Sequence, residues 1–220
     1  MNINDELIES VKIGDIDTVK LLLDRGADIH AQNDWVLRWA SSNGHTEVVK
    51  LLLDRGADIH TYDDLVLRLA SYNDHIEIVK LLLYRGVDIH TNDDALRSAS
   101  YNGHTETVKL LLDRGADIHT LNDLSLRCAS RNGHTETVKL LLNRGADIHA
   151  CNDDASRWAS HNGHTETVKV LEEHLIKEEM CKLNLIIEEK DQVLKVIKEF
   201  DFKYIDCDEE IEELRRILKK

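Results

Sequence analysis

The pattern of apolar and polar residues along this chain repeats about every thirty residues. The string Arg-Gly-Ala-Asp-Ile-His begins at Arg25, Arg55, Arg114 and Arg144, and a version with Val begins at Arg85, so successive copies lie 30, 30, 29 and 30 residues apart. A fixed period of this length is typical of stacked supersecondary units rather than of one globular core. We therefore expect a solenoid in which each unit packs against its neighbours.

Each unit predicts a pair of helices. In residues 31–60, the apolar spacing predicts a first helix over 35–42 and a second over about 46–54, with a break at Asn43-Gly44. Gly56 and its equivalents follow the second helix, where the backbone usually turns left-handed, a conformation that glycine adopts without steric penalty. The polar residues 32–34 between two units predict a short connecting finger.

An aspartate precedes the first helix of each unit and an arginine follows it four residues later. At Asp34 and Arg38 this spacing predicts an N-cap and an ion pair within reach along the helix. The same spacing recurs at Asp64/Arg68, Asp93/Arg97, Asp123/Arg127 and Asp153/Arg157. Because the pair returns at one repeat position, we interpret it as structural.

The stretch from Asn43-Gly44-His45-Thr46-Glu47-Val48-Val49-Lys50 through Gly56-Ala57-Asp58-Ile59-His60 resembles the ankyrin repeat. The resemblance covers about residues 1–170 and divides into six repeats, at about 1–30, 31–60, 61–90, 91–119, 120–149 and 150–174. Ankyrin repeats usually have 33 residues, whereas these have about 30 and lack the Thr-Pro pair that normally opens the first helix. This short, Asn-Asp-rich form is similar to the ankyrin-repeat proteins of giant DNA viruses.

The resemblance implies a mainly α fold, an ankyrin-repeat solenoid of helix hairpins followed by a helical C-terminal tail. The missing residues fall in the segment that forms the projecting β-hairpin of longer repeats, so we expect shortened fingers with little or no strand. The fourth repeat is one residue shorter again, and aligning Asn92-Asp93 with Asn152-Asp153 places this deletion at the fingertip. The helices should keep their register.

The tail, residues 171–220, contains no glycine, and Leu175 replaces the glycine that ends the second helix elsewhere. We expect a helix over about 165–189, a second over 191–199 and a last helix over 209–219. Apolar residues recur at helical spacing at Ile176, Met180, Leu183, Ile187, Leu194 and Ile197. Two alternatives stay open: the tail covers the apolar end of the sixth repeat, or it is a dimerisation or recruitment helix.

The charge of the chain narrows the class of partner. With 28 Lys and Arg against 42 Asp and Glu, the formal net charge is −14, which disfavours binding to nucleic acid or to an anionic membrane and favours a basic partner. The acidic start lacks the pattern of a secretory signal, and the four cysteines lack the spacing of a disulfide framework. We expect an intracellular protein, which the viral resemblance would place in the host cytoplasm.

The twelve histidines are candidates for chemistry. A His-x-Glu motif at His45, His75, His104, His134 and His164 matches half of a zinc-deaminase signature, but the Pro-Cys-x-x-Cys half is absent. A motif that returns at one repeat position indicates architecture, with the imidazole bonded to neighbouring backbone. A second row, at His30 and its equivalents, should have a spacing too wide for a shared zinc ion. We therefore expect no metal, no cofactor and no enzyme activity.

Positions that vary while the repeat frame stays constant are candidates for recognition. In ankyrin proteins the first helices and fingers line the concave surface that binds protein partners, so the resemblance places two variable rows of the first helix near that groove. The candidates for partner contact are Trp35, Tyr62, Tyr72, Tyr101, Leu121, Leu124, Arg131 and His161. A third row holds Trp39 and Trp158, which we expect to be buried between helices.

These features predict a non-enzymatic adaptor that binds one protein partner through its concave face. The alternative is a structural or assembly protein that acts through its C-terminal helices.

Overall fold

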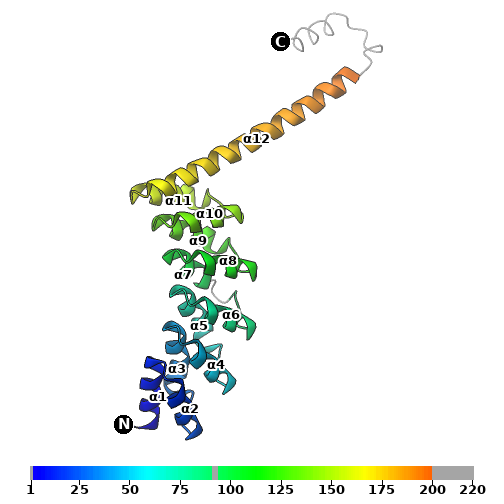
Figure 1. Ribbon diagram of the computed structural model, residues 1–220. Coiled ribbons are helices and arrows are strands. Elements are labelled where there is room, and N and C mark those ends of the chain that lie inside the picture. Colours follow the sequence, from blue (N-terminus) through cyan, green and yellow to red (C-terminus); the bar gives the residue numbers. More distant parts are fainter. Residues whose placement is uncertain (1, 91–93, 200–220) are drawn as a thin grey trace, which may run out of the picture. The chain divides into compact units, whose positions relative to one another are not determined.

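The computed structural model describes residues 2–90 and 94–199, and these residues form an all-helical array (Figure 1). The helices are α1 (Ile3–Ile13), α2 (Ile16–Asp24), α3 (Ala31–Ser42), α4 (Thr46–Asp54), α5 (Thr61–Tyr72), α6 (Ile76–Tyr84), α7 (Asp94–Asn102), α8 (Thr105–Asp113), α9 (Thr120–Arg131), α10 (Thr135–Asn143), α11 (Ala150–His161) and α12 (Thr165–Glu199). Within this described part there is no β-strand, which confirms the prediction of fingers without strand.

The helices of the first compact unit, Met1–His174, form two rows. Figure 1 shows α1, α3, α5, α7, α9 and α11 stacked in one row, and α2, α4, α6, α8 and α10 in the other. Leu37 of α3 and Leu52 of α4 are fully buried, and their equivalents in the neighbouring repeats are buried as well. The core is therefore a continuous apolar layer between the two rows.

Local backbone geometry explains where the helices begin and end. Gly56, after α4, has φ 91°, a left-handed value that confirms its predicted role as a stop. Before the first helix the chain makes a left-handed turn, with φ near 54° at Asp34 and at all three residues of 121–123. Right-handed helix therefore starts at Trp35, as predicted. The bounds of α3 also include the preceding turn, so that α3 begins at Ala31. The proposed deletion site in the fourth repeat lies outside the described residues, while α7 and α8 keep the expected register.

The histidines before the second helices join neighbouring repeats. The imidazole Nε2 of His75 donates to the backbone oxygen of Ser42 at 2.9 Å, more than thirty residues earlier in the chain. The same bond joins His45 to Lys12, His104 to Tyr72, His134 to Tyr101 and His164 to Arg131, at 2.9–3.1 Å. These bonds confirm the structural interpretation of the repeated motif.

The aspartate before the first helix also joins repeats, and the prediction of its role was wrong. The Asp34 carboxylate accepts hydrogen bonds from the Thr61 hydroxyl at 3.1 Å and the Asp58 amide at 3.4 Å, both in the following finger. It also contacts His30 Nδ1 at 2.7 Å. The Asp34 carboxylate is thus hydrogen-bonded to the next repeat and does not pair with Arg38.

The arginines of the first helices consequently find other partners. Arg127 binds Asp154 of the next repeat at 3.0 Å, and Arg157 contacts the same carboxylate at 3.3 Å. Arg97 binds Asp94 at 2.7 Å, and Arg68 reaches the same residue at 3.4 Å. The predicted pairs Asp64/Arg68, Asp123/Arg127 and Asp153/Arg157 were therefore wrong, and Asp93 lies outside the described residues.

The second unit, from Leu175 onward, contains most of α12, which continues unbroken to Glu199. The predicted break near residue 190 was wrong. Lys190 and Asp191 are polar, but the segment holds no glycine or proline that would end a helix. The predicted last helix over 209–219 lies outside the described residues, and the idea that the tail covers the sixth repeat stays a prediction.

Candidate functional site

The predicted contact residues lie on the row of first helices and on the turns before them. Tyr72 ends α5, Tyr101 lies on α7 and Arg131 ends α9, and all three are exposed at one repeat position. His161 of α11 is exposed at the same position. Tyr62 and Leu121 are exposed at fingertips, whereas Trp35 and Leu124 are half-buried. The residues thus form an elongated surface with one or two side chains per repeat.

At the N-terminal end of this surface, two tryptophans stack. The rings of Trp35 and Trp39 have centroids 4.7 Å apart and an interplanar angle of 13°. Lys12 Nζ lies 5.4 Å from the Trp35 ring and 6.0 Å from the Trp39 ring, within the range of a cation–π interaction. Trp39 remains 37% exposed, so the prediction that it is buried was wrong.

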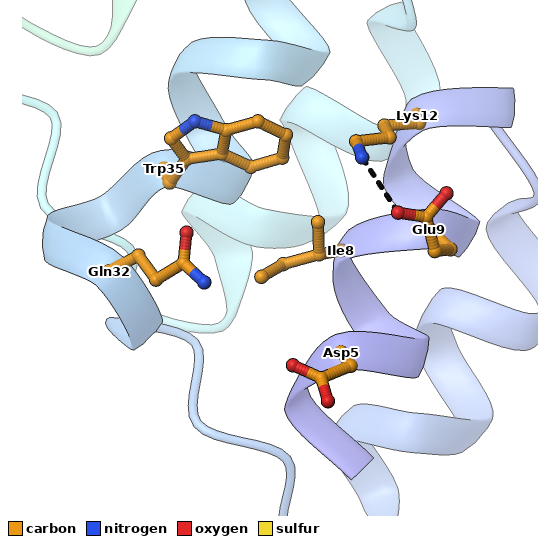
Figure 2. Close-up of a pocket in the computed structure, with 6 residues that line it drawn as sticks. All are labelled: Asp5, Ile8, Glu9, Lys12, Gln32 and Trp35. Carbon is orange, nitrogen blue, oxygen red and sulfur yellow. Dashed lines mark hydrogen bonds and ion pairs between the residues drawn. The ribbon is translucent and has the colours of Figure 1, made fainter. Parts of the chain in front are cut away.

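A pocket of about 360 Å³ opens between α1 and α3 beside this stack (Figure 2). Its lining residues are Asp5, Ile8, Glu9, Lys12, Gln32 and Trp35. Figure 2 shows the Lys12 amine directed at Glu9, whose carboxylate it meets at 2.6 Å. The pocket therefore combines an apolar floor from Ile8, one aromatic wall and carboxylates at its rim.

A second cluster lies at the C-terminal end. The Arg131 guanidinium is 4.9 Å from the Trp158 ring centroid, and the His161 ring meets the same indole edge-on at 6.0 Å. Trp158 is half-buried, because the arginine from the preceding repeat covers one of its faces. Arg131 and His161 belong to different repeats, and both contact Trp158, which had been predicted to be buried between helices.

The backbone of the variable position is held in the same way in each repeat. The carbonyl oxygens of Ser42, Tyr72, Tyr101 and Arg131 each accept the histidine bond from the following repeat. The side chain at this position is serine, tyrosine or arginine, while the main chain keeps the same partner. Side chains at this position can therefore vary while this backbone bond between repeats is kept.

A family profile described as "Ankyrin repeats (3 copies)" matches residues 7–93 and 67–152, well over half of the chain. The chain belongs to the ankyrin-repeat family. The crystal structure of the human ASB11 ankyrin repeat domain is similar to it with a TM-score of 0.70 and 23% identity, over 76% of this chain and 82% of that one. At this identity the likeness shows the fold alone. No curated protein sequence matches the chain.

Ankyrin repeats are generally protein–protein interaction modules, and the fold is typically a non-enzymatic scaffold. No group of three or more His, Cys, Asp or Glu side chains that could hold a metal ion is found among the described residues. Nor is any of the described helices long and apolar enough to cross a membrane. Cys128 of α9 is half-buried, and this burial raises the pKa of its thiol despite the nearby arginines 97, 127 and 131. A thiol of that kind is a weak nucleophile.

Sequence reasoning missed the cations that cover the aromatic residues of the ankyrin repeats. The Arg38 guanidinium lies 4.5 Å from the ring centroid of Tyr62 in the next finger, and Lys12 covers the tryptophan pair. Both contacts cross from one repeat to the next, so spacing within a repeat could not show them. The order of side chains along the surface could have suggested them, since a cation in one repeat is followed by an aromatic residue in the next.

Proposed function

We propose that the protein is a non-enzymatic adaptor that binds a protein partner through the surface of its first helices and fingertips. The observation that carries the proposal is the row of exposed aromatic side chains on this surface, Trp39, Tyr62, Tyr72 and Tyr101. Tyrosine, tryptophan and arginine are the side chains that dominate binding energy in protein interfaces. The ankyrin-repeat family uses the same surface, the concave one, for its partners.

We further propose that the partner offers a basic segment. The net charge of −14 supports this choice, because it attracts cations over a distance of about one Debye length. The pocket beside Trp35 supports it locally, since its lining carries two carboxylates, Asp5 and Glu9, against the single amine of Lys12, which pairs with Glu9. The cysteine pattern and the viral resemblance support action inside the cell, in the host cytoplasm.

The test compares tyrosines on the row of first helices with a tyrosine on the row of second helices. In one variant Tyr72 and Tyr101 are changed to Ala, and in the control Tyr84 of α6 is changed to Ala; Tyr84 is 83% exposed but lies on a second helix. Partners are captured from host cells and identified by mass spectrometry, and their affinities for each purified variant are then measured by titration calorimetry. We expect the first variant to bind at least about tenfold more weakly and the control to bind unchanged.

Equal binding by wild type and by the Tyr72/Tyr101 variant would refute the proposal, provided that circular dichroism shows the variant to be folded. A partner that is lost with the Tyr84 variant would refute it as well, because the contact would then lie on the second helices.

A second candidate function is assembly through the C-terminal helix. One observation favours it: beyond Leu175, α12 exposes several large apolar side chains, including Ile176, Met180, Leu183 and Ile187. Exposed apolar surface of this extent on one helix usually marks a contact site.

A further inference from the structure

The exposed apolar side chains of α12 follow a heptad pattern. Ile176, Met180, Leu183, Ile187 and Leu194 are separated by steps of four, three, four and seven. Steps of four and three place them at alternating d and a positions, and Lys190 occupies the d position inside the last step. We call these six positions, 176, 180, 183, 187, 190 and 194, the α12 seam.

A single helix with this seam leaves a stripe of apolar side chains exposed to water. Most helical stability in proteins comes from packing of an apolar face rather than from intrinsic propensity. The four residues Ile176, Met180, Leu183 and Ile187 are all exposed in the described chain. Ile186 and Val193 widen the seam along one edge, at the g positions of the heptad, and both are exposed.

We propose that the α12 seam pairs with the α12 seam of a second copy in an antiparallel coiled coil centred between Leu183 and Ile187. In this register Leu183 lies opposite Ile187 of the second copy, and Ile176 lies opposite Leu194. Lys190 lies opposite Met180, whose flexible side chain can pack along the lysine stem. The inference names the partner for the second candidate function and does not depend on the first-helix surface.

Charge complementarity selects the antiparallel orientation. A parallel pair in register would place Lys190 against Lys190 of the second copy within the apolar seam, where like charges repel strongly. The antiparallel pair separates the two lysines and brings Lys177 beside Asp191 of the second copy, once at each end. Both residues occupy e positions, and e positions face one another across an antiparallel seam.

The wide edge of the seam supports the same orientation. In the antiparallel register Ile186 faces Ile186 of the second copy next to the two-fold axis, so that two exposed apolar side chains cover each other. In a parallel pair Ile186 would instead face the Asp191 carboxylate. A dimer of this kind would carry two sets of ankyrin repeats and so gain avidity for a repetitive partner.

The first experiment uses two leucines of the full-length chain that differ only in their place on the helix. Leu183 is in the seam and Leu185 is outside it, and each is 57% exposed. Sedimentation equilibrium at tens of micromolar should give a dimer for wild type and for Leu185→Glu, and a monomer for Leu183→Glu. A monomeric wild type would overturn the inference. So would equal behaviour of the two variants.

Orientation is tested by cysteine cross-linking in a chain whose four native cysteines are changed to Ser. Ile186→Cys should form an intermolecular disulfide with oxidised glutathione, and Ile187→Cys should form much less, because Ile187 faces Leu183 of the second copy. The reverse ranking would show a parallel pair and would overturn the proposal. The Tyr72/Tyr101 variant should remain dimeric, so failure of the groove and failure of the seam are distinguished.

Discussion

Gly133→Ala should destabilise the ankyrin repeats considerably more than Gly163→Ala, although the two glycines have nearly the same conformation and sequence context. Their φ values are 73° and 74°, and both stand in the sequence Asn-Gly-His-Thr-Glu-Thr-Val-Lys. A Cβ atom on Gly133 would lie 2.5 Å from Nδ1 of His164, in the next repeat. A Cβ atom on Gly163 would meet no atom within 4 Å.

The shared part of the effect is the left-handed backbone, which costs an alanine about 1–2 kcal/mol. At Gly133 the imidazole must also retreat by roughly 1 Å to reach an ordinary contact distance of about 3.5 Å. That movement strains the bond of 3.0 Å from His164 Nε2 to the Arg131 carbonyl. Loss of this bond costs about 0.5–1.5 kcal/mol and local overpacking about 1–3 kcal/mol. We expect Gly133→Ala to cost about 2 kcal/mol more than its control.

One repeat already contains a Cβ at this position, and there a side-chain bond accompanies it. Asp74 stands where the other repeats have glycine, with φ 60°, and His104 still reaches the Tyr72 carbonyl at 2.9 Å. The Asp74 carboxylate accepts a bond of 2.7 Å from the buried Thr107 hydroxyl, which offsets part of the strain. Alanine has no such group, so it cannot recover this energy.

Urea unfolding followed by circular dichroism measures the difference directly, with m-values compared to check that the unfolding unit is unchanged. In a His164→Ala background, Gly133→Ala should cost no more than Gly163→Ala, because the obstructing ring is gone. Equal destabilisation by the two alanines in the native background, or an undiminished effect in the His164→Ala background, would refute the argument.

Three further outcomes are expected. Ser100→Ala should raise the free energy of unfolding by about 1 kcal/mol, and with it the urea midpoint. The serine hydroxyl is buried without a hydrogen-bond partner among the described residues. Asp15→Ala should lower the urea midpoint at pH 7, since hydrogen bonds from the Thr18 hydroxyl and amide stabilise the Asp15 carboxylate and lower its pKa. The difference in midpoint between wild type and variant should shrink as the pH falls below about 3.9 and the carboxylate becomes protonated. Iodoacetamide should modify Cys128 more slowly than the exposed Cys151, as mass spectrometry of the labelled peptides would show.

The sequence allowed most of the fold to be predicted, because the features that define it are local and recur. The helix pairs of the ankyrin repeats and the glycine at 56 follow from residues close together in the chain, and the structural role of the histidines follows from their return at one repeat position. Contacts between repeats were harder to foresee. Asp34 was assigned to Arg38, four residues away, although two of its partners lie 24 and 27 residues away at Asp58 and Thr61.

The exposure of the predicted contact residues was foreseen in outline but not in detail. Variation between repeats correctly pointed to exposed positions such as Tyr72 and Tyr101. The family pattern placed Trp39 in the core, but a stacked neighbour, Trp35, supports it at the surface instead. Whether one large ring is covered or exposed depends on the ring beside it, which a pattern of positions does not encode.

The histidine bond to a backbone carbonyl has a consequence for how such a chain can evolve. Every residue has the same backbone carbonyl, whatever its side chain. The histidine of a newly duplicated unit therefore finds a hydrogen-bond acceptor on whichever unit precedes it. Arrays can therefore lengthen, shorten or exchange internal units by recombination while each junction is preserved. Substitution at positions 42, 72, 101 and 131 leaves this bond in place, because the bond depends on none of these side chains.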